Sequence, residues 1–409
     1  MTEQAHTPTF RIATPQAALD DLTARIRRTR WTESHPGEDW SRGVPESYLR
    51  GLADYWADEF DWRAVEADLN RFPQDVRTID DLPIHYVHAR SPRAQSFPLL
   101  LLHGWPSSPL EFLDVIDPLL DLGYDVIVPS LPGFAWSGTP QQQGWGVQRM
   151  AKALAALMGE LGHDSYGVHG GDWGTPIAVH IASHDEAHVR GIHLTSLVTV
   201  PDATEIPLMS EAEMGIMAEA MRFDAVGTGW RKIQSTRPVT LAYSLADSPV
   251  GQLAWIIEKY QEWSSADGVP EEAIDRDRLL AAVTLYWLTN TAGTSAQIYY
   301  ESNRREEDFA ATWLGPWDVR VPVGVVASAK DVVRPIRMLA ENRFPTLCHW
   351  SEWPDTGHFP ALEAPQRLVD DLDVFFTEHA THTAPHGHRS RSSRPTLQAL
   401  ATMTERAIS

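Results

Sequence analysis

The sequence predicts an α/β fold: a mostly parallel sheet covered by helices, with an inserted helical lid and an N-terminal extension of helices and a hairpin. Three observations support this prediction. From Phe97 onward, short apolar strands alternate with amphipathic helices, an order that favours parallel strand pairing. The alternation stops near Val200 and returns near Asp318, which indicates an insertion. Before Phe97, helical patterns lead into two adjacent strand patterns.

The N-terminal extension, residues 7–96, begins with a predicted helix. Thr14-Pro15 is a capping residue followed by a first-turn proline, and apolar residues follow at helical spacing. Further helices are predicted over 45–59 and 63–71, and strands over 75–79 and 82–89 on either side of a turn. The apolar faces of these elements need a partner, so we expect the region to wrap the core.

The core is predicted from residues 97–199 and 318–380. The first strand, 97–102, is almost wholly apolar, as expected where both faces of a sheet are covered. The predicted elements that follow are a helix over 109–122, a strand over 125–129, a helix over 148–161, a strand ending at Val168, a helix after Trp173, strands over 191–197, 321–327 and 347–353, and a final helix over 365–379.

Residues 200–317, between the two parts of the core, are predicted to form a helical lid over a pocket. This stretch is rich in tryptophan, with Trp230, Trp255, Trp263, Trp287 and Trp313. Residues 381–409 mix His, Arg and Ser at their start, and we expect a mostly disordered tail. Histidines cluster around that junction, but their loose spacing and the lack of a cysteine partner predict no metal site.

Composition excludes several classes of function. The chain has 409 residues, 43% of them hydrophobic, and a net charge of −21, which argues against a nucleic-acid or anionic-membrane partner. Its single cysteine, Cys348, excludes an intrachain disulfide framework and suits a reducing cytoplasm. No signal peptide and no membrane-spanning run is recognisable. We therefore expect a cytoplasmic protein, with a homodimer left open.

The motif with the most chemical content is Gly170-Gly171-Asp172-Trp173-Gly174, directly after a predicted strand. It has the layout of a nucleophile elbow, in which G-x-S-x-G usually presents a serine. Here a carboxylate holds the nucleophile position. A carboxylate can attack saturated carbon and leave an alkyl ester on the enzyme. The alternative is a turn aspartate that caps the next helix.

Two later residues occur in the chain order of α/β-hydrolases, which is nucleophile, acid, histidine. Asp331 follows a predicted strand, at the edge where open α/β sheets hold their sites. His358 lies in a loop before the last helix. Asp331 can orient His358, and His358 can activate water. Asp355 is a competing acid, but it is close in sequence to His358.

A third motif, His103-Gly104-Trp105-Pro106, follows the strand after which this fold draws one oxyanion donor. We expect the backbone N–H groups of Trp105 and Trp173 to form the oxyanion pair. An ordinary strand-to-helix turn, with a cis proline, is the alternative.

Together these motifs resemble the microsomal-type epoxide hydrolases of the α/β-hydrolase superfamily, over roughly residues 7–380. The resemblance also covers Gly357-His358-Phe359 and the lid stretches 233–238 and 247–251. It implies an N-terminal region of the epoxide-hydrolase type and a small hydrophobic epoxide as substrate. It also implies Asp172 as nucleophile, Asp331 as charge partner and His358 as base, with no metal or organic cofactor.

The family uses two lid tyrosines to protonate the epoxide oxygen, and one of them maps onto Tyr299. The second maps onto Trp230, whose indole N–H can donate a hydrogen bond but is not a useful acid. This departure predicts a single proton donor and altered regiochemistry or substrate shape. His103, Pro106, Trp230 and Tyr300 are predicted to line the substrate pocket.

Two rival functions stay open at this stage. A haloalkane dehalogenase uses the same aspartate nucleophile, and an indole N–H can hold a departing halide. Against it stand Trp105, where such enzymes commonly have a side-chain amide, and the long N-terminal region. A ligand-binding protein on a retired hydrolase fold would instead have lost a catalytic residue, and all three triad positions are filled.

Overall fold

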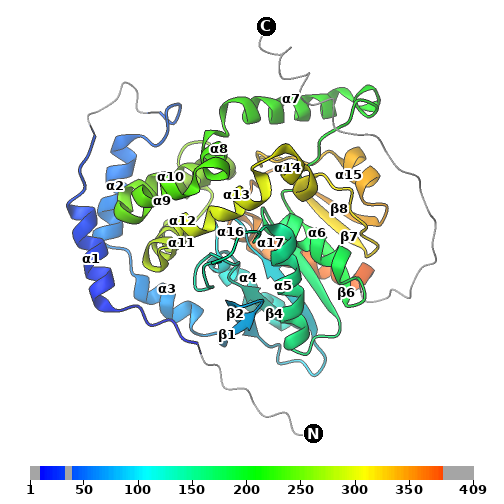
Figure 1. Cartoon of the computed structure of the whole chain (residues 1–409), viewed down its shortest axis with the longest axis horizontal. Coiled ribbons are helices and arrows are strands. Elements are labelled where there is room, and N and C mark those ends of the chain that lie inside the picture. Colours follow the sequence, from blue (N-terminus) through cyan, green and yellow to red (C-terminus); the bar gives the residue numbers. More distant parts are fainter. Residues whose placement is uncertain (1–9, 33–38, 381–409) are drawn as a thin grey trace.

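A computed structural model of the chain describes residues 10–32 and 39–380. Its centre is an eight-stranded sheet in the order β1-β2-β4-β3-β5-β6-β7-β8 (Figure 1). The strands are β1 (Gln74–Ile79), β2 (Leu82–Ala89), β3 (Phe97–Leu102), β4 (Tyr124–Pro129), β5 (Tyr166–Gly170), β6 (Val189–Leu194), β7 (Val323–Ser328) and β8 (Leu347–Trp353). The pairs from β4 to β8 are parallel, and the β1–β2 and β2–β4 pairs are antiparallel. The predicted fold class is confirmed.

Strand β3 shows why its sequence is continuously apolar. Leu100 and Leu102 belong to the hydrophobic cluster on one face of the sheet, which includes α5 (Val147–Glu160) and α6 (Gly174–His184). Leu99 and Leu101 belong to a second cluster, formed with α4 (Leu113–Leu122) and α17 (Pro365–Phe375). Because successive strand residues point to opposite faces, a strand between two helical layers is apolar at every position.

The N-terminal elements are held by the rest of the molecule. The helices are α1 (Gln16–Arg27), α2 (Glu46–Asp58) and α3 (Trp62–Leu69). Strand β2 pairs with β4, so the hairpin extends the central sheet. Helices α1 and α2 pack on each other and on α10 (Pro249–Trp263), and α3 contacts α11 (Arg276–Thr289) (Figure 1). The region therefore contacts both the sheet and the inserted helices.

The stretch between β6 and β7, all of it described, contains helices and no strand. Besides α10 and α11, these are α7 (Glu211–Val226), α8 (Gly229–Thr236), α9 (Pro238–Asp247), α12 (Ala292–Ser295), α13 (Gln297–Asn303) and α14 (Glu306–Trp313). We call residues 200–317 the inserted helical segment. Its first helix, α7, has no buried residue and runs along the upper rim in Figure 1.

Several element boundaries differ from the sequence-based expectation; the final helix, for example, ends at Phe375 and is followed by a π-helical turn, Phe376–Ala380. The strand expected over 191–197 ends at Leu194, because the chain turns at Ser196, whose φ of 53° is incompatible with a strand. The helix expected over 109–122 is divided into a 3₁₀ turn, Pro109–Phe112, and α4. The predicted tail, residues 381–409, lies outside the described residues.

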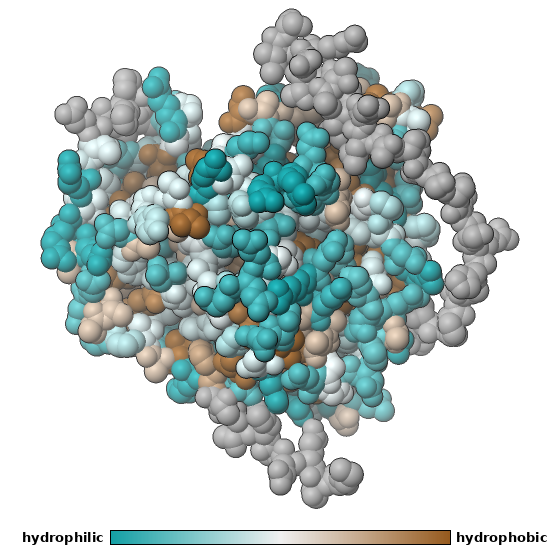
Figure 2. Space-filling view, in the orientation of Figure 1, coloured by the Kyte–Doolittle hydropathy of each residue, from teal (hydrophilic) through white to brown (hydrophobic). Residues whose placement is uncertain are grey.

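The surface is largely polar on the face seen in Figure 2, where apolar side chains form small, separate groups. Among the described residues, no helix is long and apolar enough to cross a bilayer.

Candidate active site

Asp172 stands on a strained turn between β5 and α6. Its φ of 49° is left-handed, a conformation that non-glycine residues rarely adopt and that active sites tolerate when the surroundings enforce it. Gly104, in the loop after β3, is one of the enforcing contacts. A Cβ atom on Gly104 would lie 2.1 Å from Asp172 Oδ1. A residue with a side chain at position 104 would therefore displace the Asp172 carboxylate.

The same loop supplies a hydrogen bond to that carboxylate. The backbone N–H of Trp105 donates to Asp172 Oδ1 over 2.8 Å. The Trp105–Pro106 peptide bond is cis. Trp173 follows Asp172 directly and its side chain is buried, whereas the role of its amide as second oxyanion donor stays a prediction.

His358 reaches Asp172 from the other side of the site. Its Nε2 lies 3.4 Å from Asp172 Oδ2, and its Nδ1 lies 2.8 Å from Asp331 Oδ1. Asp355, the competing acid, instead pairs with Arg367 at the surface. With Nδ1–H donating to Asp331, Nε2 is left to accept a proton.

Asp331 is held by two donors besides the histidine. The hydroxyl of Ser196 donates to Asp331 Oδ2 over 2.8 Å, and the Val333 N–H donates to Oδ1 over 2.9 Å. Ser196 Oγ also lies 3.2 Å from His358 Nδ1. Both Asp331 and His358 are buried. Burial alone would lower the pKa of His358, but the charge of Asp331 and the contacts with both aspartates raise it well above its ordinary value.

The loop that carries His358 is held by a single carboxylate. Glu363 accepts hydrogen bonds from the N–H groups of Gly357 (2.9 Å) and Phe359 (3.0 Å). It also accepts one from Ser265 of the inserted helical segment, over 2.8 Å. The His358 N–H itself donates to the Trp263 carbonyl over 2.8 Å. The histidine loop and the inserted segment are therefore joined by backbone contacts.

An aromatic cluster covers Asp172 from the side of the inserted helical segment. Tyr299, on α13, packs edge-on against Trp105, Trp173 and Trp230, with ring centroids 5.9, 4.7 and 5.5 Å away. Burial raises the pKa of Tyr299 well above its ordinary value, and the nearby charge of Asp172 adds to that increase. Its phenol therefore stays protonated at neutral pH.

Trp230, on α8, occupies the position predicted for a second tyrosine. Its ring stacks on Trp105 with centroids 5.1 Å apart and an interplanar angle of 13°. It also packs on Trp263, 5.0 Å away. Its indole N–H is buried and has no hydrogen-bond partner within the described part of the chain. An unpaired buried donor therefore lies in the aromatic cluster beside Tyr299.

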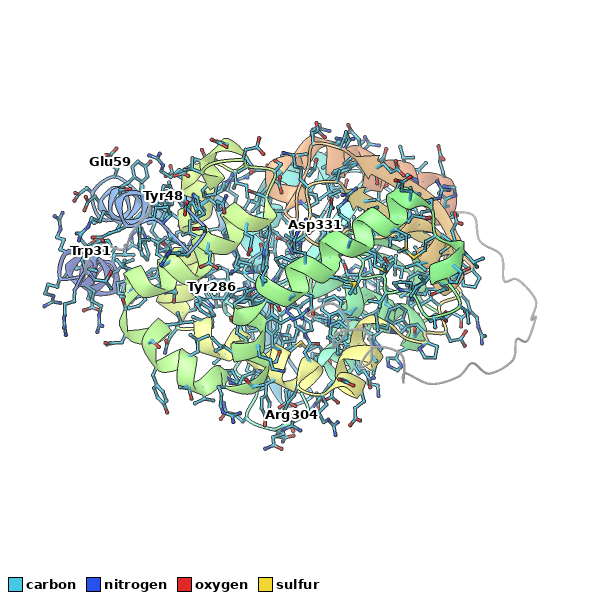
Figure 3. All side chains as sticks on the ribbon, turned by 90° about the horizontal axis from the view of Figure 1, so that it is seen from above. Trp31, Tyr48, Glu59, Tyr286, Arg304 and Asp331 are labelled. Atoms are coloured by element: carbon cyan, nitrogen blue, oxygen red, sulfur yellow. The ribbon has the colours of Figure 1, made fainter. Side chains whose placement is uncertain are left out.

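Two of the residues predicted to line the substrate pocket have other contacts. Tyr300 accepts a hydrogen bond from Arg304 over 2.6 Å, and Figure 3 places Arg304 at the periphery, away from Asp331. His103 accepts a hydrogen bond from the Leu131 N–H over 3.2 Å, and its Nδ1 lies 3.0 Å from the Gly104 carbonyl. Burial lowers the pKa of His103 to about 4, so it is a neutral, structural histidine.

A small cavity lies next to Asp172 and His358. The volume open to the centre of a water molecule is about 20 Å³. All of its lining residues come from 104–112, 169–195 and 358–368, and none from the inserted helical segment. The polar groups on its wall include the side chains of Ser107, Glu111, Asp172, Thr195 and His358. Asp172 therefore borders this small cavity, which has polar and apolar lining residues, as well as the aromatic cluster.

Comparison with known proteins shows the family of this chain. Residues 7–112 match the family model described as "Epoxide hydrolase N terminus", and residues 98–365 match that of the alpha/beta hydrolase fold. A relative from Stigmatella aurantiaca is 41% identical over 378 residues, which are 90% of this chain and 84% of the relative. Epoxide hydrolase 1 of Sus scrofa is 30% identical and aligns over 90% of this chain and 87% of its own length. The chain belongs to the epoxide hydrolase family.

Solved structures of this family have the same fold. The juvenile hormone epoxide hydrolase from the silkworm Bombyx mori superposes with a TM-score of 0.84 at 29% identity, over 90% of this chain and 93% of that one. The Aspergillus niger epoxide hydrolase superposes with a TM-score of 0.80 at 30% identity, over 90% and 96% of the two chains. The family predicted from the motifs is confirmed.

Three acidic or hydroxyl residues of this epoxide hydrolase site were missed by sequence reasoning. Ser196 lies at the carboxyl end of the strand predicted over 191–197, so its place at the carboxyl edge of the sheet was a usable signal. Glu363 lies four residues after Phe359, within reach of the loop that it caps. Glu111 falls within the helix predicted over 109–122, and no sequence signal marks its contact with the cavity.

One further group of ionisable residues is formed by side chains from β6, β8 and α17. His193, His349 and Asp371 place one possible ligand atom each within 4.8 Å of one another. Each of these atoms already has a hydrogen-bond partner: Asp371 binds both histidines, at 2.8 and 3.1 Å, and also the Ser351 hydroxyl. These hydrogen bonds hold the pKa of Asp371 well below its ordinary value against the effect of burial, so the group is a satisfied hydrogen-bond network.

Proposed function

We propose that this protein hydrolyses a small, largely apolar epoxide to a vicinal diol through an alkyl ester on Asp172. The observation that carries the proposal is the position of one carboxylate between two groups. Its Oδ1 accepts the Trp105 amide, and its Oδ2 faces His358 Nε2 at 3.4 Å. Membership of the epoxide hydrolase family supports the same reaction.

In the first half-reaction, Asp172 attacks one epoxide carbon while the ring oxygen departs as an alkoxide. That oxygen needs a proton, and Tyr299 is the candidate donor because its buried phenol stays protonated and lies in the aromatic cluster over Asp172. The inserted helical segment then acts as a lid that excludes bulk water from the ester. The products of this step are the ester and a tyrosinate.

In the second half-reaction, His358 takes a proton from a water molecule, which attacks the ester carbonyl of Asp172. The Trp105 amide, with that of Trp173, stabilises the oxyanion, and the diol departs. The proton released by hydrolysis returns to Tyr299, so the cycle closes without net proton uptake. No metal or organic cofactor is needed for these steps.

The charges of the site favour this order of events. In the free enzyme, contact with the Asp172 carboxylate is one cause of the high pKa of His358. Alkylation turns that carboxylate into a neutral ester. The loss of a neighbouring negative charge lowers the pKa of the imidazole, so His358 becomes a competent base when hydrolysis begins.

A single-turnover reaction in ¹⁸O-labelled water tests the proposal. Enzyme in excess over styrene oxide is expected to give a first diol whose new oxygen comes from unlabelled Asp172, with label entering only in later turnovers. Solvent label in the first diol would rule out the ester route. Asp172→Asn serves as the control for background hydrolysis.

One observation favours a second candidate, haloalkane dehalogenation. The unpaired indole N–H of Trp230 lies in the aromatic cluster and could hold a departing halide. Halide release from a panel of chloro- and bromoalkanes measures this activity directly. We expect release to be absent or far slower than epoxide opening.

A further inference from the structure

Helix α8 carries two buried hydrogen-bond donors that the proposed mechanism leaves unused. They are the indole N–H of Trp230 and the side-chain NH₂ group of Gln234, and neither has a hydrogen-bond partner among residues 10–32 and 39–380. Gln234 is fully buried. Because the two residues are four positions apart in one helix, their side chains lie on the same face. The helix face that brings Trp230 into the aromatic cluster therefore carries a second free donor.

The orientation of the Gln234 amide is fixed by its oxygen. Gln234 Oε1 accepts a hydrogen bond from the indole N–H of Trp255, on α10, over 2.9 Å. An indole N–H can only donate, so the amide oxygen must face Trp255 and the NH₂ group must face away from it. Rotating the amide by half a turn would leave the Trp255 N–H without an acceptor. The unpaired group of Gln234 is therefore a donor.

The contacts of Trp230 place its ring beside the candidate proton donor. Trp105 stacks on the ring, and Tyr299 packs edge-on against it with ring centroids 5.5 Å apart. Helix α8 packs against α13, which carries Tyr299 (Figure 1). The indole N–H lies in the plane of its ring, so the stacked Trp105 ring does not receive it. A free donor is thus available in the cluster next to the phenol.

One unpaired donor does not by itself indicate a ligand, because Trp317 also has a buried indole N–H without a partner among the described residues. The arrangement on α8 is different, since two such donors share one helix face. A buried donor without a partner is destabilising, and two of them add that cost twice. An acceptor oxygen has two lone pairs, so one oxygen of a bound molecule can pair with both donors.

We propose that Trp230 and Gln234 bind an acceptor oxygen of the substrate, so that the preferred substrates are epoxides with an ether, carbonyl or hydroxyl oxygen close to the epoxide ring. Tyr299 is then left to the ring oxygen, while the two donors of α8 hold the second oxygen. No bond forms or breaks at this position. It sets specificity, because an epoxide without the acceptor leaves both donors unpaired. This substrate class rests on the proposed epoxide hydrolysis.

Two matched pairs of epoxides test the proposal. Methyl glycidyl ether and 1,2-epoxypentane have equal chain lengths and differ by one oxygen in place of a methylene. The pair 4-methoxy-1,2-epoxybutane and 1,2-epoxyhexane differs in the same way, one carbon further from the epoxide ring. The measured quantity is the kcat/KM of each ether divided by that of its matched hydrocarbon. This ratio does not depend on the fraction of folded enzyme, and the intrinsic reactivity of each epoxide cancels between variants.

The variants are Trp230→Phe and Gln234→Met, each of which removes one donor and keeps a side chain of similar shape. In at least one pair, we expect the parent ratio to exceed the ratio of each variant on the order of ten-fold. The matched control is Trp317→Phe, which also loses a buried unpaired indole N–H, from a ring that stacks on Phe344. It should keep the parent ratios.

Ratios in Trp230→Phe and Gln234→Met equal to those of the parent, in both pairs, would overturn the proposal. So would a decrease of the same size in the Trp317→Phe control, because the effect would then not belong to α8. Absence of diol from all four epoxides with the parent enzyme would instead contradict epoxide hydrolysis itself, so the two failures are distinguishable.

Discussion

At the scale of single residues, Trp230 distinguishes this site from an epoxide hydrolase site in which two lid tyrosines donate protons. Trp230→Tyr places a second acidic O–H beside Tyr299, so we expect alkylation by styrene oxide to accelerate by roughly ten-fold, a fraction of the effect of a full general acid. Trp230→Phe keeps a ring but removes the indole donor and should not accelerate the reaction. Stopped-flow tryptophan fluorescence measures the step. A tyrosine variant no faster than the phenylalanine one would contradict the single-donor interpretation.

Ser196 combines backbone strain with a functional hydroxyl. Its φ of 53° suits glycine, and its Oγ supports Asp331. Ser196→Gly loses the hydrogen bond but relieves the strain, whereas Ser196→Ala loses the bond and keeps the strain. We expect the glycine variant to be about 1 kcal/mol more stable than the alanine variant by urea unfolding.

Both Ser196 variants should slow ester hydrolysis by a similar factor, on the order of ten-fold, because Asp331, which orients His358, loses the same donor in both. Single-turnover hydrolysis rates check this. Different hydrolysis rates in the two variants would show that backbone strain, and not the hydroxyl, is what supports the imidazole.

At the scale of elements, Glu363 joins three segments: the histidine loop, its own helix α16 (Pro360–Glu363) and the inserted helical segment. Glu363→Gln keeps the size but replaces one acceptor oxygen with an amide donor facing backbone N–H groups. We expect a loss of about 1–3 kcal/mol in unfolding free energy and slower alkylation as well as slower hydrolysis. Selective loss of hydrolysis alone would contradict this structural role.

The elements also show what the sequence could and could not predict. Strand β3 and the turn at Asp172 were predictable, because continuous apolarity and small residues around an acid are local properties. The contact of Glu111 with the cavity and the hydrogen bond from Ser265 to Glu363 were not, because each depends on segments that are distant in sequence. Tyr299 and Tyr300 illustrate the same limit: they are adjacent in one helix, and only packing decides that Tyr299 faces Trp173 while Tyr300 meets Arg304.

At the scale of the whole molecule, buried neutral histidines predict sensitivity to acid. Burial lowers the pKa of His85 to about 3 and that of His103 to about 4. In the unfolded chain both take up protons near pH 6.5. The unfolded state therefore binds more protons below that pH, and stability falls as the pH drops from 6.5 toward 4. His358, with a raised pKa, acts in the opposite direction, but only above pH 6.5.

Each such histidine contributes a slope of up to about 1.4 kcal/mol per pH unit. Urea unfolding at pH 7, 6 and 5 measures the total slope. His85→Gln can keep hydrogen bonds to Ser130 and Gln74 without titrating, and it should flatten the slope by up to that amount. An unchanged slope would show that His85 does not titrate on unfolding in this range.

The cavity and the aromatic cluster next to Asp172 are built by different segments, and this separation has a consequence for engineering. The small cavity is built by residues 104–112, 169–195 and 358–368, and the aromatic side by helices α8 and α13 together with Trp105 and Trp173. Libraries restricted to those two helices, with Tyr299 kept, can redesign selectivity toward bulkier oxiranes while the residues proposed to hydrolyse the ester are left unchanged. Substrate scope and turnover then become independently adjustable traits.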